Sequence, residues 1–429
     1  MIDGDSGSSS GKDSLRILLV CQGDLTSAST KQAVAFAEGL VARGHSVLLS
    51  LSGDATSVDR EGIHNHPRFT VSFRREYAFL MGRESLRQAQ RFRPHVLHAF
   101  NPRHYTVNVA RQFHRVTKAA VVVHWEDDEV GIRRGVVKRT PIRRLGRLAR
   151  RILCYPWPRQ GVFITRSSLR WVQQNASMCD ALTPALAASV RDEAGLACMT
   201  VFPSFVGYDQ GESSSDPLAG QPEPILNASK IAYTGSVHTE SIDDFRLAIR
   251  AVALVVRRGY DVAFLYAGQA LPRYDVIAIA EREGLPANRV ASLGYVPFRQ
   301  VRSILASASV LVQPGQPNRF NQLRLPSKVQ AYLQSGTPTV MFSVGLGELL
   351  KDGAEVVKLH GFTAEELAER IVELLDDPGL AARVGEGGQR AAQRLFDRDR
   401  NVAALVYCYR VALETDAASS KSAPAKLIR

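Results

Sequence analysis

Short apolar segments alternate with helical segments along most of this chain, and the alternation occurs in two separate series. The first series covers residues 15–206 and the second covers residues 229–398, with a Ser-, Pro- and Gly-rich linker at 207–228 between them. Strands that alternate with helices in this way form parallel sheets with right-handed crossovers. We therefore predict an α/β fold of two doubly wound, Rossmann-like domains that face a cleft.

The expected strands are apolar runs bounded by glycine, proline or polar residues. In the first series they are Leu15–Val20, Ser46–Leu51, Phe69–Phe73, His95–Phe100, Ala119–His124 and Ala181–Pro184. In the second series they are Lys230–Gly235, Val262–Gly268, Val290–Leu293, Ser309–Val312 and Thr339–Phe342. We expect a C-terminal helix at 399–414 and disordered ends at 1–14 and 415–429. Ligands of such sheets bind at the carboxyl ends of the strands, so the loops there are the candidate sites.

The length of 429 residues is too great for one compact core and favours two domains. No apolar run approaches the roughly 20 residues that span a bilayer, and residues 1–14 lack the apolar core of a secretory signal. The five cysteines are scattered, odd in number and without metal-ligand spacing. These features predict a cytoplasmic protein with reduced thiols.

The positive charge is concentrated in one part of the chain. Between Val130 and Cys179 there are twelve Lys and Arg residues and no Asp or Glu, and this excess equals the formal net charge of +12. From Thr140 onward a helical pattern separates apolar residues from a set of arginines, which are Arg143, Arg144, Arg147, Arg150 and Arg151. A basic amphipathic helix binds anionic lipid, so we predict contact with the inner face of a membrane. The alternative is a helix packed on the sheet with its arginines in water; a nucleic-acid partner is not expected, because no binding motif is present.

The segment from Arg324 to Phe342 has the pattern of a loop, a helix and a buried strand. Pro326 suits the first turn of a helix, where its missing N–H costs nothing, and Ser327 can cap the exposed amides. Gly336 provides the C-terminal stop. A helix start with free N–H groups and Lys328 in its first turn can hold a diphosphate. The alternative is an ordinary loop–helix–strand unit whose lysine is solvated.

Several short motifs occur in a fixed order along the chain. They are Ala37–Val47 with its Gly-His turn, Asp180–Leu186, Ile231–Gly235, Leu265–Gly268, Val290–Val296, Ser309–Pro314 and Pro326–Pro338. In this order the sequence resembles the family 4 (group 1) glycosyltransferases of GT-B architecture, with a close match to the Pro-Ser-Lys variant of their donor loop. The resemblance implies transfer of a hexose from a nucleotide sugar to a membrane-associated, polysaccharide or glycolipid acceptor, with retention of anomeric configuration.

The resemblance also implies the residues of the donor site. Negative charge grows on the departing diphosphate, and fixed cations and helix N-terminal amides stabilise it. The residues expected at the diphosphate are Gly235, Ser236, Arg324, Ser327 and Lys328. Those expected near the donor sugar or the nucleoside are Asn318, Asn321 and Tyr295, with simple packing as the alternative role of Tyr295. No metal or other cofactor is expected, because GT-B enzymes do not generally need one.

Polar residues that follow the strands of the first series are further candidates. His124 matches in position a histidine that many relatives hold near the transferred sugar. One of the four carboxylates after it, which we assign to Asp127, can act as a base or orient an acceptor hydroxyl. The acceptor-side candidates are Gly23, Ser27, His98 and Asn101. The alternatives are a structural histidine and solvated carboxylates.

The donor loop departs from the family at two positions. The family usually carries two glutamates separated by seven residues, and the register of Pro-Ser-Lys puts these positions at Leu323 and Ala331, whose side chains accept no hydrogen bond. Two alternatives to an enzyme follow from this. One is a noncatalytic GT-B subunit that binds a sugar nucleotide or a partner enzyme. The other is a basic peripheral membrane scaffold.

Overall fold

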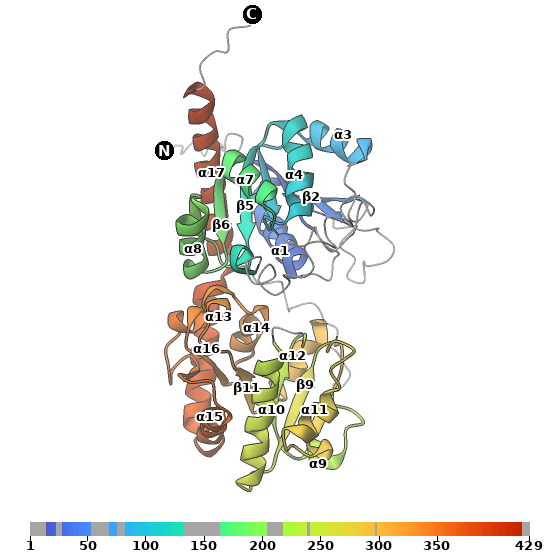
Figure 1. Cartoon of the computed structure of the whole chain (residues 1–429), viewed down its shortest axis with the longest axis vertical. Coiled ribbons are helices and arrows are strands. Elements are labelled where there is room, and N and C mark those ends of the chain that lie inside the picture. The colour runs from blue at the N-terminus through green and yellow to red at the C-terminus, as the bar shows by residue number, and fades with distance from the viewer. Residues whose placement is uncertain are drawn as a thin grey trace, which may run out of the picture. The chain divides into compact units, whose positions relative to one another are not determined.

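The computed structural model of the chain describes residues 14–22, 28–52, 68–74, 82–132, 164–203, 218–237, 241–296 and 298–422. The chain divides into two compact units, of which the first is Met1–Val206 with Arg398–Arg429 and the second is Gly207–Asp397. Each unit is built on a parallel sheet with helices around it (Figure 1). The predicted class of two doubly wound, Rossmann-like domains is confirmed.

The sheet of the first unit has seven strands within the described residues, in the order β3-β2-β1-β4-β5-β6-β7. Their bounds are β1 Arg16–Val20, β2 Ser46–Ser52, β3 Thr70–Arg74, β4 Val96–Phe100, β5 Ala120–Trp125, β6 Ala176–Ala181 and β7 Cys198–Thr200. All residues of β4 and β5 are buried. Parallel strands covered on both faces form such continuous apolar runs, which is why the sequence predicted them well.

Helices cover both faces of this first sheet. They are α1 Ala28–Ala42, α3 Arg83–Phe92, α4 His104–Thr117, α7 Arg166–Asn175, α8 Pro184–Ala194 and α17 Arg398–Ser422. One face packs on α1 and α17, through Phe36 and Tyr409, and the other packs on α4 through Phe113. Figure 1 shows α17, in red, beside β6. Helices α1 and α17 approach so closely that a β carbon at Gly39 would lie 2.4 Å from Cγ2 of Val402.

The sheet of the second unit has six described strands in the order β10-β9-β8-β11-β12-β13. Their bounds are β8 Ser229–Thr234, β9 Val262–Ala267, β10 Val290–Ser292, β11 Val310–Gln313, β12 Thr339–Phe342 and β13 Val357–Leu359. The helices are α9 Glu223–Leu226, α10 Ile242–Arg257, α11 Val276–Arg282, η3 Ala287–Arg289, α12 Phe298–Ala306, α13 Arg319–Leu323, α14 Ser327–Ser335, η4 Gly345–Leu349, α15 Ala364–Asp376 and α16 Pro378–Phe396. Helices α10 and α15 pack on one face of the sheet through residues such as Phe245 and Leu367, whereas Tyr332 of α14 belongs to a separate cluster with residues of α12.

Three features of the fold differ from the predictions. The strand expected at Ala181–Pro184 is wrong, because β6 ends at Ala181 and Pro184 begins α8, with the side chain of Thr183 accepting the N–H of Leu186. The expected disordered tail is wrong for residues 415–422, because α17 continues to Ser422. The three-residue strands β7 and β13 were not predicted. No helix within the described residues has the length and apolar character needed to cross a membrane.

Candidate active site

Each sheet has one point where the strand order reverses, which is where ligands of doubly wound sheets bind. In the first unit this point lies between β1 and β4, and in the second it lies between β8 and β11. His98 lies on β4 and Asn101 directly follows it, while Gly235 and Ser236 directly follow β8. Four residues that the sequence predicted therefore lie on or directly after the strands that flank these two points.

In the second unit, the end of β8 and the start of α14 lie against each other. The Nζ atom of Lys328 lies 3.4 Å from the centroid of the Tyr233 ring. Gly235 adopts a φ of +103°, and a β carbon there would lie 3.8 Å from the Lys328 side chain. The hydroxyl of Tyr332 accepts the backbone N–H of Thr234 at 2.7 Å and so holds α14 in register with β8. Lys328 is therefore fixed beside Gly235, whose N–H donates to the carbonyl of Ala267 at 2.8 Å and whose carbonyl accepts from the Tyr266 hydroxyl at 3.2 Å.

Arg324 and Asp244 complete a small charged cluster beside Lys328. The guanidinium Nη2 of Arg324 lies 3.3 Å from Oδ2 of Asp244, and its Cζ lies 4.4 Å from the centroid of the Phe320 ring. Burial raises the pKa of Asp244 to about 6, although Arg324 and Lys328 oppose this rise. Burial also lowers the pKa of Lys328 well below its ordinary value, and the charge of Arg324 lowers it further while Asp244 opposes. Two cations thus share one carboxylate, an arrangement that favours an additional anion.

The other residues predicted for the donor site lie around this cluster in different ways. Ser327 is the first residue of α14 rather than its cap, because Pro326 occupies the N-cap position and no side chain caps the helix. Ser327 and Ser236 are exposed. The phenol ring of Tyr295 is also on the surface, with 58% of the residue exposed. The cap predicted for Ser327 is therefore wrong, and the amides at the start of α14 lack a side-chain partner within the described residues.

Asn318 and Asn321 are engaged within their own loop. The side chain of Asn318 accepts the backbone N–H of Asn321 at 3.0 Å. Asn321 donates through Nδ2 to the carbonyl of Gln316 at 2.8 Å, and its Oδ1 is buried without a partner among the described residues. Leu323 and Ala331 are each only 5% exposed. The two positions where the family resemblance places glutamates are therefore apolar and packed.

In the first unit, four buried side chains form a continuous hydrogen-bonded chain. Tyr409 of α17 bonds through its hydroxyl to Nδ1 of His98 at 2.8 Å. Nε2 of His98 lies 2.9 Å from Oδ1 of Asp180, and Oδ2 of the same carboxylate lies 2.5 Å from Nδ1 of His124. All four residues are at most 1% exposed. The chain fixes His124 through Nδ1 and leaves its Nε2 atom for another partner.

Charge is unevenly shared along this hydrogen-bonded chain. Burial opposes ionisation of Asp180, but His124 and His98 hold its pKa well below the usual range. Burial lowers the pKa of His98, and this outweighs the attraction of Asp180. For His124 burial also acts to lower the pKa, but the charge and hydrogen bond of Asp180, with Glu126, outweigh it and raise the pKa. His124 is therefore the more readily protonated of the two histidines that flank Asp180.

Three buried polar atoms in this region lack hydrogen-bond partners among the described residues. They are Nε2 of His124, Oε1 of Glu126 and Oδ1 of Asn101. The first two atoms lie 4.0 Å apart. Glu126 is positioned through its other oxygen, which accepts from Ser29 at 2.6 Å and from Nδ2 of Asn101 at 2.9 Å. Buried polar atoms are rarely left unpaired. These three atoms are therefore candidates for binding the hydroxyl groups of a ligand.

Three of the four carboxylates after His124 divide between two directions, and the fourth, Asp128, accepts the backbone N–H of Gly131 at 2.8 Å. Glu126 approaches His124, whereas Asp127 and Glu129 lie at 3.4 Å and 2.7 Å from Nη2 of Arg103. Burial raises the pKa of Glu129 to about 7 against the attraction of Arg103. Asp127, the carboxylate assigned from the sequence, is therefore held by an arginine, and Glu126 occupies the position beside the histidine.

Two sets of predicted residues lie outside the described part of the chain. They are the acceptor-side candidates Gly23 and Ser27, and the membrane-surface arginines Arg143, Arg144, Arg147, Arg150 and Arg151. Of the cysteines, Cys21, Cys179, Cys198 and Cys408 are buried free thiols.

One group in the described residues has donor atoms close enough to consider a metal ion, namely His98, His124 and Asp180, whose atoms lie within 4.8 Å of one another. However, the two nitrogen–oxygen distances of 2.5 Å and 2.9 Å are those of hydrogen bonds. Ligands of one tetrahedral Zn²⁺ lie about 3.3 Å apart. The group therefore fits a proton-sharing chain better than a metal site.

The sequence did not predict Tyr233, Asp244, Asp180 and Tyr409 as members of these clusters. Asp180 and Tyr233 fall inside motifs that carried the resemblance, but a motif does not indicate which side chains meet. Asp244 follows Asp243 in the first turn of α10, a common position for acidic residues at a helix start. Only its burial, which leaves 6% of the side chain exposed, distinguishes it.

The second unit carries a sequence match to a known family. Residues 228–377 match the model of the family described as glycosyl transferases group 1. The second unit carries a group 1 glycosyltransferase domain. The strand β8, Gly235, Arg324 and Lys328 all belong to this glycosyltransferase domain, so the charged cluster described above lies within it.

Two similar proteins come from Streptomyces kanamyceticus. A 2-deoxystreptamine glucosyltransferase is 27% identical over 217 residues, which cover 49% of this chain and 54% of the relative. An alpha-D-kanosaminyltransferase is 27% identical over 157 residues, which cover 36% of this chain and 39% of the relative. The alignments thus span about half or less of the length of these relatives.

Solved structures extend the similarity of the glycosyltransferase domain to the whole fold. HepE of Anabaena, in complex with UDP-glucose, has a TM-score of 0.66 and 16% sequence identity over 92% of this chain and 99% of that chain. Sucrose-phosphate synthase of Thermosynechococcus elongatus has a TM-score of 0.64 and 15% identity over 92% and 98% of the two chains. At these identities the likeness is one of fold, and the fold is that of GT-B glycosyltransferases.

Proposed function

We propose that the protein is a glycosyltransferase that moves a hexose from a nucleotide sugar to an acceptor hydroxyl. The observation that supports this most directly is the pair of cations, Arg324 and Lys328, beside Gly235 at the point where the strand order of a group 1 glycosyltransferase domain reverses. Such cations neutralise the charge that grows on a departing diphosphate. The bound UDP-glucose of HepE supports a UDP-linked hexose as the donor.

In the proposed reaction the second unit binds the diphosphate. Lys328 and Arg324 supply positive charge, and the amides at the start of α14 supply hydrogen-bond donors. Gly235 has no side chain, so the diphosphate can approach the backbone after β8. The bond between the anomeric carbon and the diphosphate oxygen breaks while the acceptor hydroxyl attacks, and we propose retention of anomeric configuration.

We assign hydroxyl binding to the cluster in the first unit. His124, whose pKa is raised, can donate from Nε2, and Glu126 can accept at Oε1. A single hydroxyl oxygen about 2.8 Å from both atoms fits their separation of 4.0 Å. Glu126 thus replaces Asp127 as the carboxylate that orients or deprotonates a hydroxyl.

The acceptor that we propose is a membrane-associated or polysaccharide/glycolipid hydroxyl, reached by a protein that lies peripherally on the inner face of a membrane. The support is the basic stretch between Val130 and Cys179, which carries twelve positive charges and no carboxylate. We further propose that transfer needs no metal ion, since the cations of the second unit act on the diphosphate directly. Activity is then expected to persist in excess EDTA.

One observation favours a second candidate function. Leu323 and Ala331 are buried and apolar where the family resemblance places carboxylates. Neither can hold a ribose or sugar hydroxyl, so the alternative is a noncatalytic subunit that binds a sugar nucleotide or a partner enzyme without transfer.

Calorimetric titration with UDP-, GDP- and ADP-hexoses tests the proposal, followed by detection of the free nucleoside diphosphate and of a glycosylated acceptor in a membrane extract. We expect one nucleotide class to bind and to be consumed. Binding without consumption would favour the noncatalytic subunit. No binding of any nucleotide sugar by the folded protein would overturn the glycosyltransferase and would leave only a subunit that binds a partner enzyme.

A further inference from the structure

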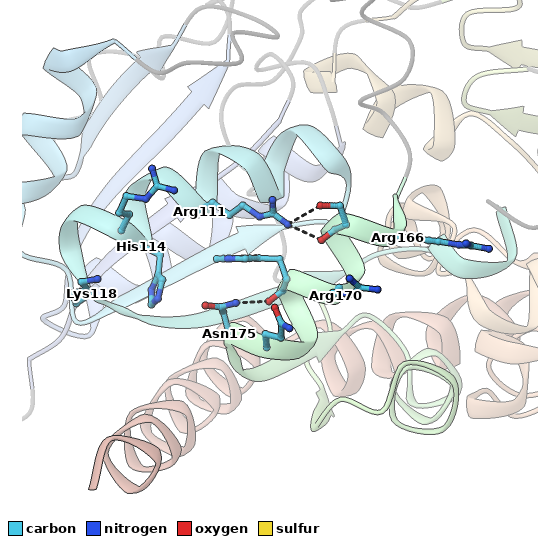
Figure 2. A pocket seen from close by; sticks show the side chains of 10 residues that line it. Arg111, His114, Lys118, Arg166, Arg170 and Asn175 are labelled. Carbon is cyan, nitrogen blue, oxygen red and sulfur yellow. Dashed lines mark hydrogen bonds between the residues drawn. The ribbon is translucent and has the colours of Figure 1, made fainter. Parts of the chain in front are cut away.

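A second site lies on the surface of the first unit, away from the strand ends that carry the candidate active site. A groove of about 760 Å³ opens along the paired helices α4 and α7. Figure 2 shows that its side chains come from both helices: Arg111, His114 and Lys118 from α4 and the residue that ends it, and Arg166, Arg170 and Asn175 from α7. The groove therefore belongs to a fixed pair of helices rather than to a loop.

The groove is strongly cationic. Five lining side chains carry a full positive charge, namely Arg111, Arg115, Lys118, Arg166 and Arg170, and no Asp or Glu lines it. Within the described residues, none of the five forms an ion pair with a carboxylate. Like charges gathered without counter-charges repel one another and create a local field that attracts anions. The groove thus has the charge expected of a site for a multiply charged anion.

The chain that directly precedes α7 cannot supply the missing negative charge. Residues 133–163 contain arginines and lysines but no Asp or Glu. Arg166 and Arg170 are themselves part of the basic stretch between Val130 and Cys179, and the fold brings Arg111, Arg115 and Lys118 of a distant segment to the same groove. Two separate basic segments therefore converge here.

Arg111 is held rigidly in the groove. Its Nη2 donates to the carbonyl of Ser167 at 2.7 Å, as the dashed lines of Figure 2 mark. Its Cζ lies 5.7 Å from the centroid of the Trp171 ring. The ring of His114 also lies against this indole, at a centroid distance of 6.1 Å and an angle of 75°. The Nε atom of Arg111 is buried and lacks a partner within the described residues. An arginine fixed against an aromatic ring loses little freedom when it binds an oxyanion.

We propose that this groove binds a phosphate-bearing ligand, which is either the headgroup of an anionic lipid or a soluble phosphate or diphosphate compound. Four of the five cations are arginines, whose planar fork matches phosphate oxygens. The exposed cations Arg115, Lys118, Arg166 and Arg170 surround the fixed guanidinium of Arg111 and can adapt to more than one phosphate. This site is independent of the proposed donor site, which lies in the second unit.

The test uses a groove variant in which Arg115→Gln, Arg166→Gln and Arg170→Gln are combined, all at exposed positions. Its matched control combines Arg83→Gln, Arg87→Gln and Arg91→Gln on α3, which removes the same charge from exposed arginines of the same unit. Full-length proteins are titrated with inorganic pyrophosphate in excess UDP, and are floated with vesicles of phosphatidylglycerol and phosphatidylcholine or of phosphatidylcholine alone. Circular dichroism verifies that both variants are folded.

We expect the wild type and the control to bind pyrophosphate and the groove variant to bind at least about tenfold more weakly. A lipid headgroup is the natural ligand if three results are found together. The wild type and the control float with the anionic vesicles, the groove variant does not float, and pyrophosphate releases the bound protein from the vesicles. If pyrophosphate binds but the protein does not float, the ligand is a soluble phosphate compound. Equal binding by the groove variant and the control, or no pyrophosphate binding by the wild type, would overturn the proposal. UDP affinity is expected to be the same in all three proteins, so a failure of the donor site is recognised separately.

Discussion

The ammonium group of Lys328 lies 3.4 Å from the centroid of the Tyr233 ring, with Arg324 and Asp244 in the same cluster. A half-buried lysine on an aromatic face is partly stabilised by the ring, but it has lost part of its water. This explains why its pKa is lowered although a carboxylate lies nearby. The cluster is better suited to hold an incoming anion than to stabilise the unliganded fold.

Replacing Lys328 by Met removes the charge and keeps much of the volume. We expect UDP affinity to fall by about 1–3 kcal/mol, the usual scale of a lost charged hydrogen bond. The free energy of unfolding is expected to rise or stay unchanged, because the variant avoids burying a charge. Since the folded-state pKa of Lys328 lies below its ordinary value of 10.5, the protein becomes more stable as the pH rises towards that value. Any gain in the free energy of unfolding that Lys328→Met produces is therefore largest at lower pH.

The control for this variant is Lys351→Met, which removes an exposed lysine from the same unit. Titration with UDP and urea denaturation at several pH values are the measurements. An unchanged UDP affinity in Lys328→Met would place the diphosphate elsewhere. A large loss of stability together with the loss of affinity would mean that Lys328 is needed for folding instead.

Binding of UDP is expected to take up protons. A diphosphate beside Lys328 and Asp244 raises both pKa values, and the pKa of Asp244 is already about 6. Uptake by Asp244 is expected near pH 6 and above, and uptake by Lys328 between its lowered folded-state pKa and its ordinary value of 10.5. The measurement is the enthalpy of UDP binding in buffers of different ionisation enthalpy, whose slope gives the number of protons bound. The Lys328→Met variant should lose the proton uptake of Lys328 and keep that of Asp244. A slope of zero at every pH would contradict the prediction.

Gly235→Ala tests whether a side chain directly after β8 interferes with UDP. Gly235 has a φ of +103° and lies beside Lys328, whereas Gly259 has a φ of +92° and a β carbon added there would meet no atom within 4 Å. Both alanine variants should lose about 1–3 kcal/mol of unfolding free energy, because this region of φ is strained for other residues. Only Gly235→Ala should also weaken UDP binding. Equal UDP affinities in two folded variants would remove Gly235 from the site.

The sequence predicted most of the fold because parallel strands that are buried on both faces form uninterrupted apolar runs, as Val121–Val123 does within β5. It did not predict β7 or β13, since three residues carry too little pattern. It misplaced β6 because Thr183 and Pro184 continue an apolar run but form a helix start. At this boundary the helix cap formed by the Thr183 side chain determined the structure, and the apolar character of the run did not.

Members of the candidate site were predicted where the sequence signal is local and missed where they depend on distant partners. Lys328, Gly235 and Arg324 belong to or adjoin short motifs with a recognisable role, and His98 lies on a recognisable strand. Their partners were not predicted: Asp244 lies 80 residues from Arg324, and Tyr409 lies 311 residues from His98. Contacts over such separations are set by the packing of whole elements, as when α17 returns to the first unit.

The buried pair of His124 and Asp180 leads to a prediction about pH. The folded-state pKa of Asp180 is lowered from 3.8, so its contribution to stability is present above that value and is lost as the pH falls through the folded-state pKa. The pKa of His124 is raised from 6.5, so its contribution is complete below that value and is lost as the pH rises through the folded-state pKa. The coupling between the two residues should therefore be largest between pH 3.8 and 6.5.

A double-mutant cycle of Asp180→Asn and His124→Gln, followed by urea denaturation at each pH, measures this coupling. Asp180→Asn alone is expected to cost about 3–5 kcal/mol, because asparagine offers one acceptor oxygen to two histidines and removes the buried negative charge between them. The exposed pair Arg91 and Glu84, 3.9 Å apart, is the control and should show almost no coupling at any pH. A coupling between His124 and Asp180 that is equally large at pH 6 and well above the folded-state pKa of His124 would contradict a charged histidine. Nε2 of His124 would then be an acceptor, and the hydroxyl of the proposed acceptor would have to donate to it.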